Sequence, residues 1–346
     1  MKAIVFHGPN DVRVESVPDP TLRDARGAIV RITRASICGS DLHLVHGAVP
    51  AIPGTVIGHE CVGVVEDVGT DVRRFRTGDR VIVPGVIGCG DCDPCRRGYP
   101  VGCVNWFNKV FGMTPDLPGG QAEAIAVPNA DVNLCPTPPE MSDEQVLFLT
   151  DILPTGYFAA DNAALKPGHT VVVIGCGPVG LFAIMCAQLF SPSTILAVDR
   201  VGYRLDQARA LGATPIDASR QDVQAAVLDA TNGQGAHAVI EAVGAAETVH
   251  LAFELVGVGG VVSIVGVLIQ QDFPFPMGTA FMKDLTLRIG LVNVPRFLPP
   301  LIALIRSQRI DPTRLISHRL PLTDGVRAYE LFDGRKDGCL KVTLAP

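Results

Sequence analysis

Residues 169–199 read HTVVVIGCGPVGLFAIMCAQLFSPSTILAVD. The run 169–175 predicts an apolar β-strand, 178–190 predicts a helix and 193–199 predicts a second strand. The alternation continues along the chain, with further helices and strands predicted at 202–213, 237–244, 246–256 and 260–267. Strands that are apolar along nearly their whole length and separated by helices are typical of a parallel sheet buried on both faces. This part of the chain is therefore predicted to form a doubly wound α/β domain.

Three glycines, Gly175, Gly177 and Gly180, form a G-x-G-x-x-G pattern where the first of these strands meets the first helix. The first glycine permits a tight turn, the second lets a pyrophosphate approach the backbone, and the third allows the helix to pack closely on the strand. The phosphates would lie at the helix N-terminus, where backbone N–H groups lack partners within the helix. The pattern predicts a dinucleotide site.

An acidic residue, Asp199, ends the second strand, 24 residues beyond Gly175. A carboxylate in this position accepts hydrogen bonds from the adenosine ribose hydroxyls and repels a 2′-phosphate, which favours NAD over NADP. Arg200, beside it, could pair with a phosphate instead. Arg200 and Arg204 are otherwise expected to be surface cations at the start of the next helix.

The rest of the chain has a different texture. At 346 residues the chain is long enough for two domains. Residues 1 to about 150 contain short alternating runs, such as AIVRITRAS and CVGVVEDVG, between frequent turn residues, which is typical of a mainly β domain. After residue 292 follow a proline-broken helical stretch and a last strand, LKVTLAP. Because this tail is too short to fold alone, we expect it to complete the first domain.

Composition excludes several classes of protein. The chain is 47% hydrophobic and 18% charged, as in well-packed globular proteins. A net charge of −6 implies no general affinity for nucleic acid. No run reaches the eighteen or so apolar residues that a membrane span needs, and the N-terminus has no signal-peptide pattern. We therefore expect a cytoplasmic protein with reduced thiols.

Four cysteines fall within the run GCGDCDPCRRGYPVGC, at Cys89, Cys92, Cys95 and Cys103. Gaps of this kind allow four thiolates to close a tetrahedron around one cation, which is the usual form of a structural zinc site. Two disulfides are the alternative, and it is disfavoured because the short even gaps would strain them. The lobe is predicted to hold zinc for its shape and leaves no position open for chemistry.

A second set of donors is spread along the first domain. Cys38, His59 and Asp151 offer a thiolate, an imidazole and a carboxylate, a set that would leave the fourth position of a catalytic zinc open. They are far apart in the sequence, so their spacing does not establish a site. Asp151 precedes a helical pattern and could instead be its N-cap.

The chain resembles the zinc-dependent medium-chain alcohol dehydrogenases over essentially its full length. The resemblance rests on GHE-x2-G-x5-G-x2-V at residues 58–72, the four-cysteine run and the glycine turn, which occur in the family's order. It implies a GroES-like, mainly β catalytic domain (1–152 and 293–346) and a Rossmann NAD-binding domain (153–292). Asp at 151 resembles the branch of bacterial secondary-alcohol and glutathione-independent formaldehyde dehydrogenases.

The same resemblance implies roles for individual residues. It implies two zinc ions per subunit: a structural one in the four-cysteine lobe, and a catalytic one bound by Cys38, His59 and Asp151. Asp41 matches a carboxylate that hydrogen-bonds the ligand histidine, and Glu60 matches one behind the zinc that ligates it transiently. Ser40 and His43 match a proton relay. Cofactor contacts are implied for Thr155, Val179, Val267 and Lys341, the last near the pyrophosphate, and substrate-pocket walls for Gly85, Trp106 and Val292.

Together these features predict an NAD-dependent zinc alcohol dehydrogenase acting on small alcohols and carbonyls. Secondary alcohols are preferred because Gly85 replaces the bulky aromatic of some primary-alcohol enzymes. A polyol or sugar dehydrogenase, a formaldehyde-oxidising enzyme and a non-catalytic relative remain alternatives. The family commonly forms dimers or tetramers by pairing the sheet edges of the nucleotide domains, so a homodimer or homotetramer is expected, with the apolar segment 260–270 as a candidate contact.

Overall fold

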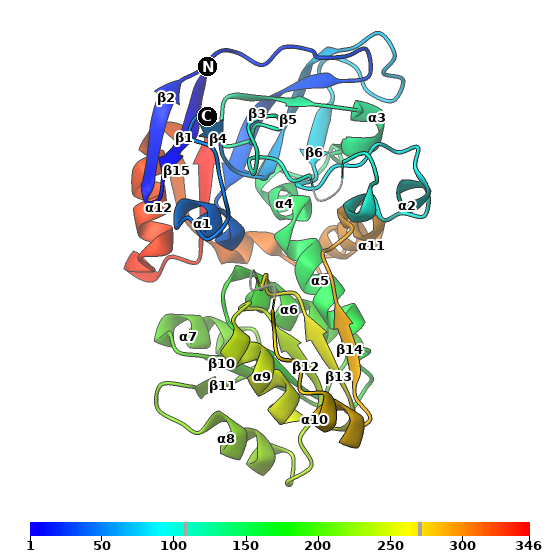
Figure 1. Ribbon diagram of the computed structural model, residues 1–346, viewed down its shortest axis with the longest axis vertical. Helices are drawn as coiled ribbons and strands as arrows, with labels where there is room; N and C mark the ends of the chain where they lie inside the picture. The colour runs from blue at the N-terminus through cyan, green and yellow to red at the C-terminus, as the bar shows by residue number, and fades with distance from the viewer. Residues whose placement is uncertain (107–108, 269–271) are drawn as a thin grey trace. The chain divides into compact units, whose positions relative to one another are not determined.

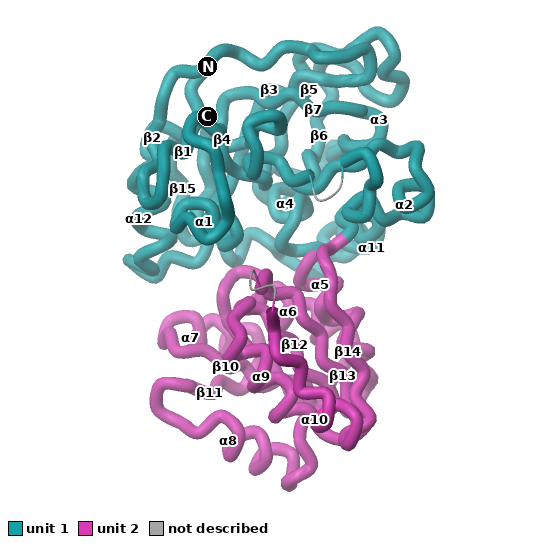
Figure 2. Tube along the Cα trace, viewed as in Figure 1, with its two compact units in different colours: residues 1–154, 293–346 teal, residues 155–292 magenta. Residues whose placement is uncertain are grey.

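The computed structural model describes residues 1–106, 109–268 and 272–346, and the chain forms two compact units (Figure 2). Unit 1 comprises Met1–Pro154 and Asn293–Pro346, and unit 2 comprises Thr155–Val292. The first break therefore lies two residues after the expected limit at 152, and the second lies at 292, as expected. Among the described residues, none of the helices combines the length and the apolar character needed to cross a bilayer.

Unit 2 is built on a six-stranded sheet in which every neighbouring pair is parallel (Figure 1). In spatial order its strands are β11 (Thr214–Asp217), β10 (Thr194–Asp199), β9 (Thr170–Ile174), β12 (Ala236–Glu241), β13 (Val256–Ile264) and β14 (Thr286–Ile289). The helices between them are α6 (Pro178–Ala187), α7 (Gly202–Ala210), α8 (Val223–Ala230), α9 (Ala246–Leu255) and α10 (Met277–Met282). This confirms the predicted doubly wound α/β fold.

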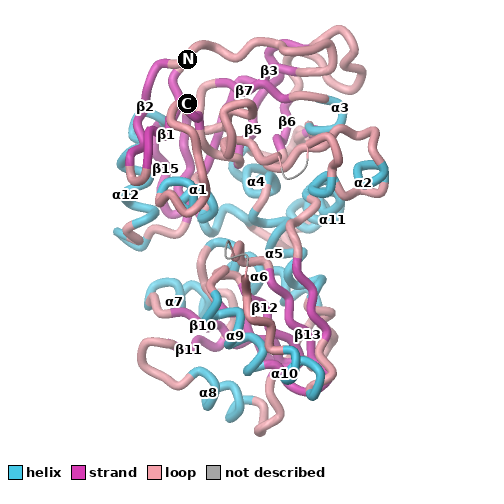
Figure 3. The backbone as a smooth tube through the Cα atoms, viewed as in Figure 1, coloured by secondary structure: helices cyan, strands magenta, loops and turns pink. Residues whose placement is uncertain are grey.

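The alternation of strands and helices in unit 2 follows from burial (Figure 3). All five residues of β9 are buried, as a strand must be when helices cover both faces of its sheet. Two strands escaped prediction: β11 is short and partly polar, and all four residues of β14 are exposed at the sheet edge. Neither strand has the apolar run on which the prediction relied. The last two residues of the segment 260–270 lie outside the described residues.

The strand order of unit 2 fixes where a ligand can enter. Numbered along the chain, the strands follow the order 3-2-1-4-5-6, and the direction of progression reverses between β9 and β12. In open parallel sheets ligands bind beyond the carboxyl ends of the strands at such a reversal. The glycine turn that follows β9 lies at this edge.

Unit 1 is mainly β, with one seven-stranded sheet and one three-stranded sheet. The large sheet contains β3 (Ala28–Ser36), β5 (Glu60–Val68), β6 (Arg80–Val83), β7 (Ala124–Val127), β8 (Cys135–Pro136), β15 (Ile316–Pro321) and β16 (Lys341–Ala345), and the small one β1 (Lys2–Gly8), β2 (Asp11–Ser16) and β4 (Thr55–Val56). Strand β16 pairs with β3, so the C-terminal strand completes this unit, as predicted.

The helices of unit 1 are short, apart from those near the C-terminus. They are α1 (Gly39–Val45), α2 (Asp93–Arg96), α3 (Ala130–Asn133), α4 (Asp143–Leu147), α11 (Val294–Arg306) and α12 (Gly325–Asp333), while α5 (Ile152–Asn162) spans the limit between the units. The expected break at Pro299 and Pro300 does not occur: both lie inside α11. One face of this helix buries Val294, Phe297, Leu298, Leu301 and Ile305, and this burial offsets the backbone hydrogen bonds that the prolines remove.

Candidate functional site

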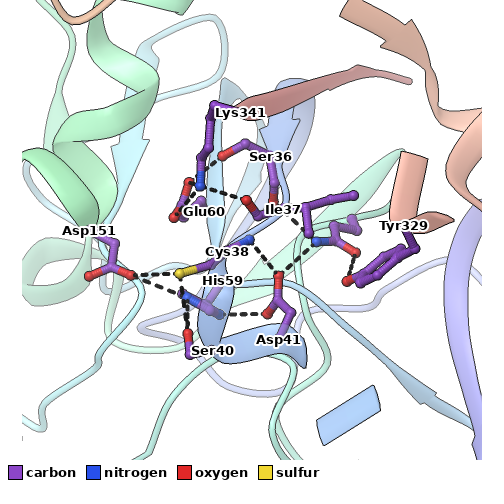
Figure 4. A network of polar contacts seen from close by, with 11 residues as sticks. Ser36, Ile37, Cys38, Ser40, Asp41, His59, Glu60, Asp151, Tyr329 and Lys341 are labelled. Carbon is purple, nitrogen blue, oxygen red and sulfur yellow. Dashed lines mark hydrogen bonds and ion pairs between the residues drawn. The ribbon is translucent and has the colours of Figure 1, made fainter. Parts of the chain in front are cut away.

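Four side chains that can bind a metal converge in unit 1 from three places in the sequence (Figure 4). Cys38 occupies the N-cap of α1, His59 and Glu60 lie where β5 begins, and Asp151 immediately precedes α5. The antiparallel pairing of β3 with β5 sets Ser36 opposite Glu60, and this register brings the end of β3 beside the start of β5. Their donor atoms all lie within 4.8 Å of one another.

The donors that the sequence singled out contact each other directly. His59 Nε2 lies 3.2 Å from Asp151 Oδ2, and Cys38 Sγ lies 3.7 Å from the same oxygen. Ser40 Oγ lies 3.2 Å from both Cys38 Sγ and His59 Nε2. Cys38 and His59 are buried, and Asp151 is partly exposed. The predicted catalytic set therefore forms one cluster, with the Ser40 hydroxyl on it.

The chemistry of this cluster suits zinc. Asp41 Oδ1 lies 3.0 Å from His59 Nδ1, which makes Nδ1 the protonated nitrogen and turns the lone pair of Nε2 toward Cys38 and Asp151. Burial, together with the charge of Glu60, raises the pKa of the Cys38 thiol, so a thiolate here needs a cation beside it. A sulfur, a nitrogen and a carboxylate oxygen are the donors that zinc takes in proteins.

Glu60 and Lys341 form a buried ion pair behind the cluster. Lys341 Nζ lies 2.9 Å from Glu60 Oε1 and 2.8 Å from Oε2, and it also donates to Ile37 O. Ser36 Oγ donates to Glu60 Oε2. This corrects the expectation that Lys341 contacts the pyrophosphate of a cofactor: its ammonium has no exposed surface and is already satisfied by a carboxylate and a carbonyl.

The four lobe cysteines form a second cluster in unit 1. Cys92 is the N-cap of α2, Cys95 lies within that helix, and Cys89 and Cys103 lie on either side of it in the sequence. All four are free thiols whose sulfurs lie within 4.8 Å of one another. Cys103 Sγ accepts the backbone N–H groups of Cys89 and Trp106 at 3.4 and 3.3 Å. Four sulfurs around one point suit a closed zinc site.

The glycine turn of unit 2 has the geometry that its sequence predicts. Gly175 has φ +93°, a conformation that glycine adopts at little cost. A Cβ on Gly180 would clash with the carbonyl oxygen of Gly175, which explains why helix α6 needs glycine there. A Cβ on Gly177 would meet only the Arg204 guanidinium, at 3.8 Å, so this face of the turn is open. Gly177 is also the N-cap of α6 and provides no side chain for its free N–H groups.

Asp199 is held beside this turn by three backbone hydrogen bonds. Its carboxylate accepts from the N–H groups of Cys176 and Arg200, both at 2.7 Å, and of Val201 at 2.9 Å. The Arg200 residue is exposed, and Arg204 is partly buried. The acidic residue is thus fixed at the carboxyl end of β10, while one arginine extends over the turn.

The residues expected to line a substrate pocket have other surroundings. A Cβ on Gly85 would lie 3.0 Å from His59 O and 3.3 Å from its Cδ2, so the missing side chain lets His59 approach and does not leave empty space. Trp106 packs against the core of unit 1 and lines a cavity of about 270 Å³ with Ile87 and Leu117. Among the described residues, the lining of this cavity includes no member of either metal cluster. Trp106 is therefore a packed aromatic side chain at the edge of the unit 1 core.

The remaining expected cofactor and substrate contacts belong to unit 2. Val267 is exposed, beyond the end of β13, and Val292 is buried. Thr155 and Val179 are partly buried, near the start of α5 and in the first turn of α6.

The expected relay residue His43 lies in unit 1, where it is a partly buried residue of α1.

Sequence reasoning missed three polar residues around the cluster: Ser36, Gln121 and Tyr329. All three are buried behind the metal donors. Ser36 hydrogen-bonds Glu60, Gln121 hydrogen-bonds Asp41 and the Ser36 carbonyl, and Tyr329 hydrogen-bonds Gln121. Glycines near these residues are the sequence feature that could have indicated close packing here. A Cβ on Gly58 would clash with the Gln121 side chain, and a Cβ on Gly120 would clash with Cys61.

Comparison with known proteins gives two family matches. Residues 24–138 match the alcohol dehydrogenase GroES-like domain, and residues 178–307 match the zinc-binding dehydrogenase domain. A probable zinc-binding alcohol dehydrogenase of Mycobacterium tuberculosis is 40% identical over 100% of this chain and 89% of its own length. The solved structure of the alcohol dehydrogenase TADH from Thermus sp. ATN1 has a TM-score of 0.94 and 46% identity, covering 100% of this chain and 99% of its own. A more distant relative, sorbitol dehydrogenase of Bacillus subtilis, is 30% identical over 100% of this chain and 97% of its own length.

Proposed function

Because the chain belongs to the zinc-dependent medium-chain alcohol dehydrogenase family, we propose that it interconverts small secondary alcohols and ketones with NAD(H) as the hydride carrier. The observation that carries this proposal is the convergence of Cys38, His59 and Asp151 on one point in unit 1. Family membership implies an oxidoreductase that uses zinc and a nicotinamide cofactor. Two zinc ions, one at this cluster and one at the four cysteines, are the proposed complement.

The residues of the cluster have separate tasks in this proposal. Cys38, His59 and Asp151 would hold a zinc ion, which acts as a Lewis acid toward a substrate oxygen. Asp41 keeps Nδ1 of His59 protonated, so that Nε2 is free to ligate. The Ser40 hydroxyl, 3.2 Å from two of the donors, can hydrogen-bond the substrate oxygen and carry its proton away.

In unit 2, the open face of Gly177 and the free N–H groups at the start of α6 form a place for phosphates. Asp199 supports NAD over NADP, because its fixed carboxylate would accept the ribose hydroxyls and repel a 2′-phosphate. Arg204 lies beside Gly177, where its charge would attract the pyrophosphate. The proposed contacts of the cofactor are the hydroxyl of Thr155 and the apolar side chains of Val179 and Val267.

A preference for secondary alcohols is the finer part of the proposal. It rests on two residues: Ser40, whose small hydroxyl lies beside the metal donors, and Asp151, the residue type of the secondary-alcohol branch that the chain resembles. Gly85 does not support the preference, because His59 packs against the position that its side chain would take. Oxidation of a polyol is the second candidate, favoured by the full-length similarity to a sorbitol dehydrogenase. A non-catalytic role is opposed by the presence of every donor in the cluster.

An assay of matched primary alcohols, secondary alcohols and polyols with NAD and NADP tests the proposal. We expect turnover that favours NAD and secondary alcohols, and that falls to background after the metal is removed with a chelator. Restoring zinc should restore turnover. Activity that survives complete metal removal would contradict the proposal, and a polyol preference would replace the substrate while keeping the mechanism.

His43 gives the pH dependence a direction. Burial, and then the charge of His46, lower the pKa of His43 below its ordinary value of 6.5, so it is neutral at pH 7 and can accept a proton from the substrate. Alcohol oxidation should therefore decline only below pH 6.5, as His43 becomes protonated. In His43→Gln this acidic limb of the kcat profile should be lost. A limb that is identical in wild type and variant would exclude His43 as the group that titrates.

A homodimer is the proposed assembly, formed by pairing the β14 edges of two copies. Leu287 and Ile289 of this edge strand are exposed, as are Met277 and Phe281 of the adjoining helix α10. An exposed apolar edge strand is an aggregation hazard unless another strand covers it. Light scattering should give twice the chain mass for wild type and a monomer for Ile289→Lys. A tetramer would indicate a further interface, and a monomeric wild type would contradict the pairing.

A further inference from the structure

A buried network connects the C-terminal helix α12 to the metal cluster (Figure 4). The Tyr329 hydroxyl donates to Gln121 Oε1 at 2.8 Å, and Gln121 Nε2 donates to Asp41 Oδ2 at 3.1 Å. Gln121 Nε2 also donates to Ser36 O at 3.1 Å. Tyr329, Gln121 and Asp41 are all buried, although 208 positions separate Tyr329 from Gln121.

The chemistry of the partners fixes the direction of every bond in this network. Ser36 O and a carboxylate can only accept, so the amide nitrogen of Gln121 must face both of them and its oxygen must face Tyr329. Burial, and then the charge of Asp41, raise the pKa of Tyr329 well above its usual value, which keeps the donating proton on the phenol. Tyr329 is therefore the hydrogen-bond donor at the outer end of the network.

Asp41 is the point where this network meets two metal donors. Its Oδ2 accepts from Gln121 and from the backbone N–H of Cys38 at 3.0 Å, and its Oδ1 faces His59 Nδ1 at 3.0 Å. With Oδ2 held by two donors, the carboxylate cannot rotate away from His59 without breaking both bonds. One carboxylate thus orients the imidazole and anchors the backbone of the thiol ligand.

Backbone packing holds Gln121 rigidly. Its own N–H donates to Ile57 O at 3.0 Å, and its carbonyl accepts from Ile4 at 2.9 Å. Its side chain fills the space beside Gly58, the residue before His59, which has φ +94°. Helix α12 is further tied to the end of α1 by Asp333 Oδ2, 3.0 Å from His46 Nε2. The network is therefore placed by several independent contacts.

We propose that Gln121 and Tyr329 are positioning residues of the metal site, which hold Asp41 so that His59 presents Nε2 and Cys38 stays in register with it. This inference rests on the proposed function only in requiring that Cys38, His59 and Asp151 bind zinc. Removal of an outer hydrogen-bond partner of a metal ligand typically weakens metal binding by about 10- to 100-fold. The C-terminal segment of the chain thus contributes to the affinity of a site whose ligands all lie before residue 152.

The test follows zinc leaving the full-length chain in excess chelator, where the four-cysteine site provides a second kinetic phase as an internal reference. Gln121→Met removes a donor to Asp41, the direct partner of His59, and should accelerate release from the Cys38–His59–Asp151 site by about threefold to tenfold. Tyr329→Phe, one bond further out, should accelerate it by about twofold to threefold. The phase from the four cysteines should not change, and the visible bands of the cobalt(II)-loaded chain should shift in both variants.

Two further variants make the result decisive. Thr55→Val removes a buried hydroxyl that donates to Ile52 O, outside the network, and should leave both phases unchanged. Asp41→Asn should accelerate the first phase most. If Asp41→Asn accelerates zinc release while Gln121→Met and Tyr329→Phe release zinc at the wild-type rate, the inference is wrong. If Gln121→Met does not fold, the release rate of Tyr329→Phe alone decides the question. A wild-type chain that binds zinc only at the four cysteines would overturn the proposed function and this inference together.

Discussion

His59→Ala is expected to lose alcohol turnover by about 10³-fold or more while the chain stays folded. Among the described residues, His59 provides the only nitrogen donor of its cluster. With Glu60 paired to Lys341, the loss of His59 would leave the metal with Cys38 and Asp151 as protein ligands. A loss of several kcal/mol of stabilisation at the substrate oxygen corresponds to this factor, because each 1.36 kcal/mol changes the rate about tenfold. The loss should appear in kcat/KM with NAD and the preferred alcohol.

The metal content separates this result from simple unfolding. Zinc per chain should fall from two ions to one, since the four cysteines form an independent site. The matched control is His7→Ala, because His7 is a partly exposed histidine of unit 1 that pairs with Glu15 and lies outside both the metal cluster and the network behind it. Loss of both zinc ions, or of the folded circular dichroism spectrum, would show that the variant reports on stability. Normal turnover in His59→Ala would exclude a catalytic metal at this cluster.

The parts of the fold that the sequence predicted are those set by local pattern. The apolar run of β9 and the glycines after it determine a strand, a turn and a helix within a short stretch. Gly175 has a positive φ and Gly180 has no room for a Cβ, whereas Gly177 leaves one face of the turn open. The edge strand β14 has no such signal: all four of its residues are exposed, so no burial pattern marks it. Proline in α11 was read as a break because the compensating apolar face depends on packing against the rest of unit 1.

The candidate site likewise contains residues that the sequence predicts and residues that only tertiary packing brings together. Residue types and family order placed Cys38, His59 and Asp151 together, but the side chains behind them depend on tertiary packing. Tyr329 and Gln121 show no pattern in the sequence, and only the folded chain brings them to Asp41. Lys341 shows the converse error: its position in the chain suggested a phosphate contact, whereas the pairing of β16 with β3 buries it beside Glu60.

That burial makes Lys341→Met the most destabilising single change that we expect. The Lys341–Glu60 pair has side-chain exposures of 1% and 0%, and the ammonium also lies 5.8 Å from the Phe148 ring. Removing one partner of a buried pair leaves an uncompensated charge, which costs about 3–5 kcal/mol. For a unit of this size, such a loss lowers the melting temperature by roughly 10 °C.

Urea unfolding followed by tryptophan fluorescence measures this effect in the correct unit, because Trp106 is the single tryptophan of the chain and belongs to unit 1. The double variant Glu60→Gln/Lys341→Met removes both charges and should recover most of the lost stability, since a neutral amide is far less costly to bury than a carboxylate. Lys109→Met is the matched control: its partner Asp116 is largely exposed, and such a pair contributes at most about 1 kcal/mol. If Lys341→Met were no more destabilising than Lys109→Met, Glu60 would have to be neutral in the folded chain, and the ion pair would not be what holds β16 against the metal site.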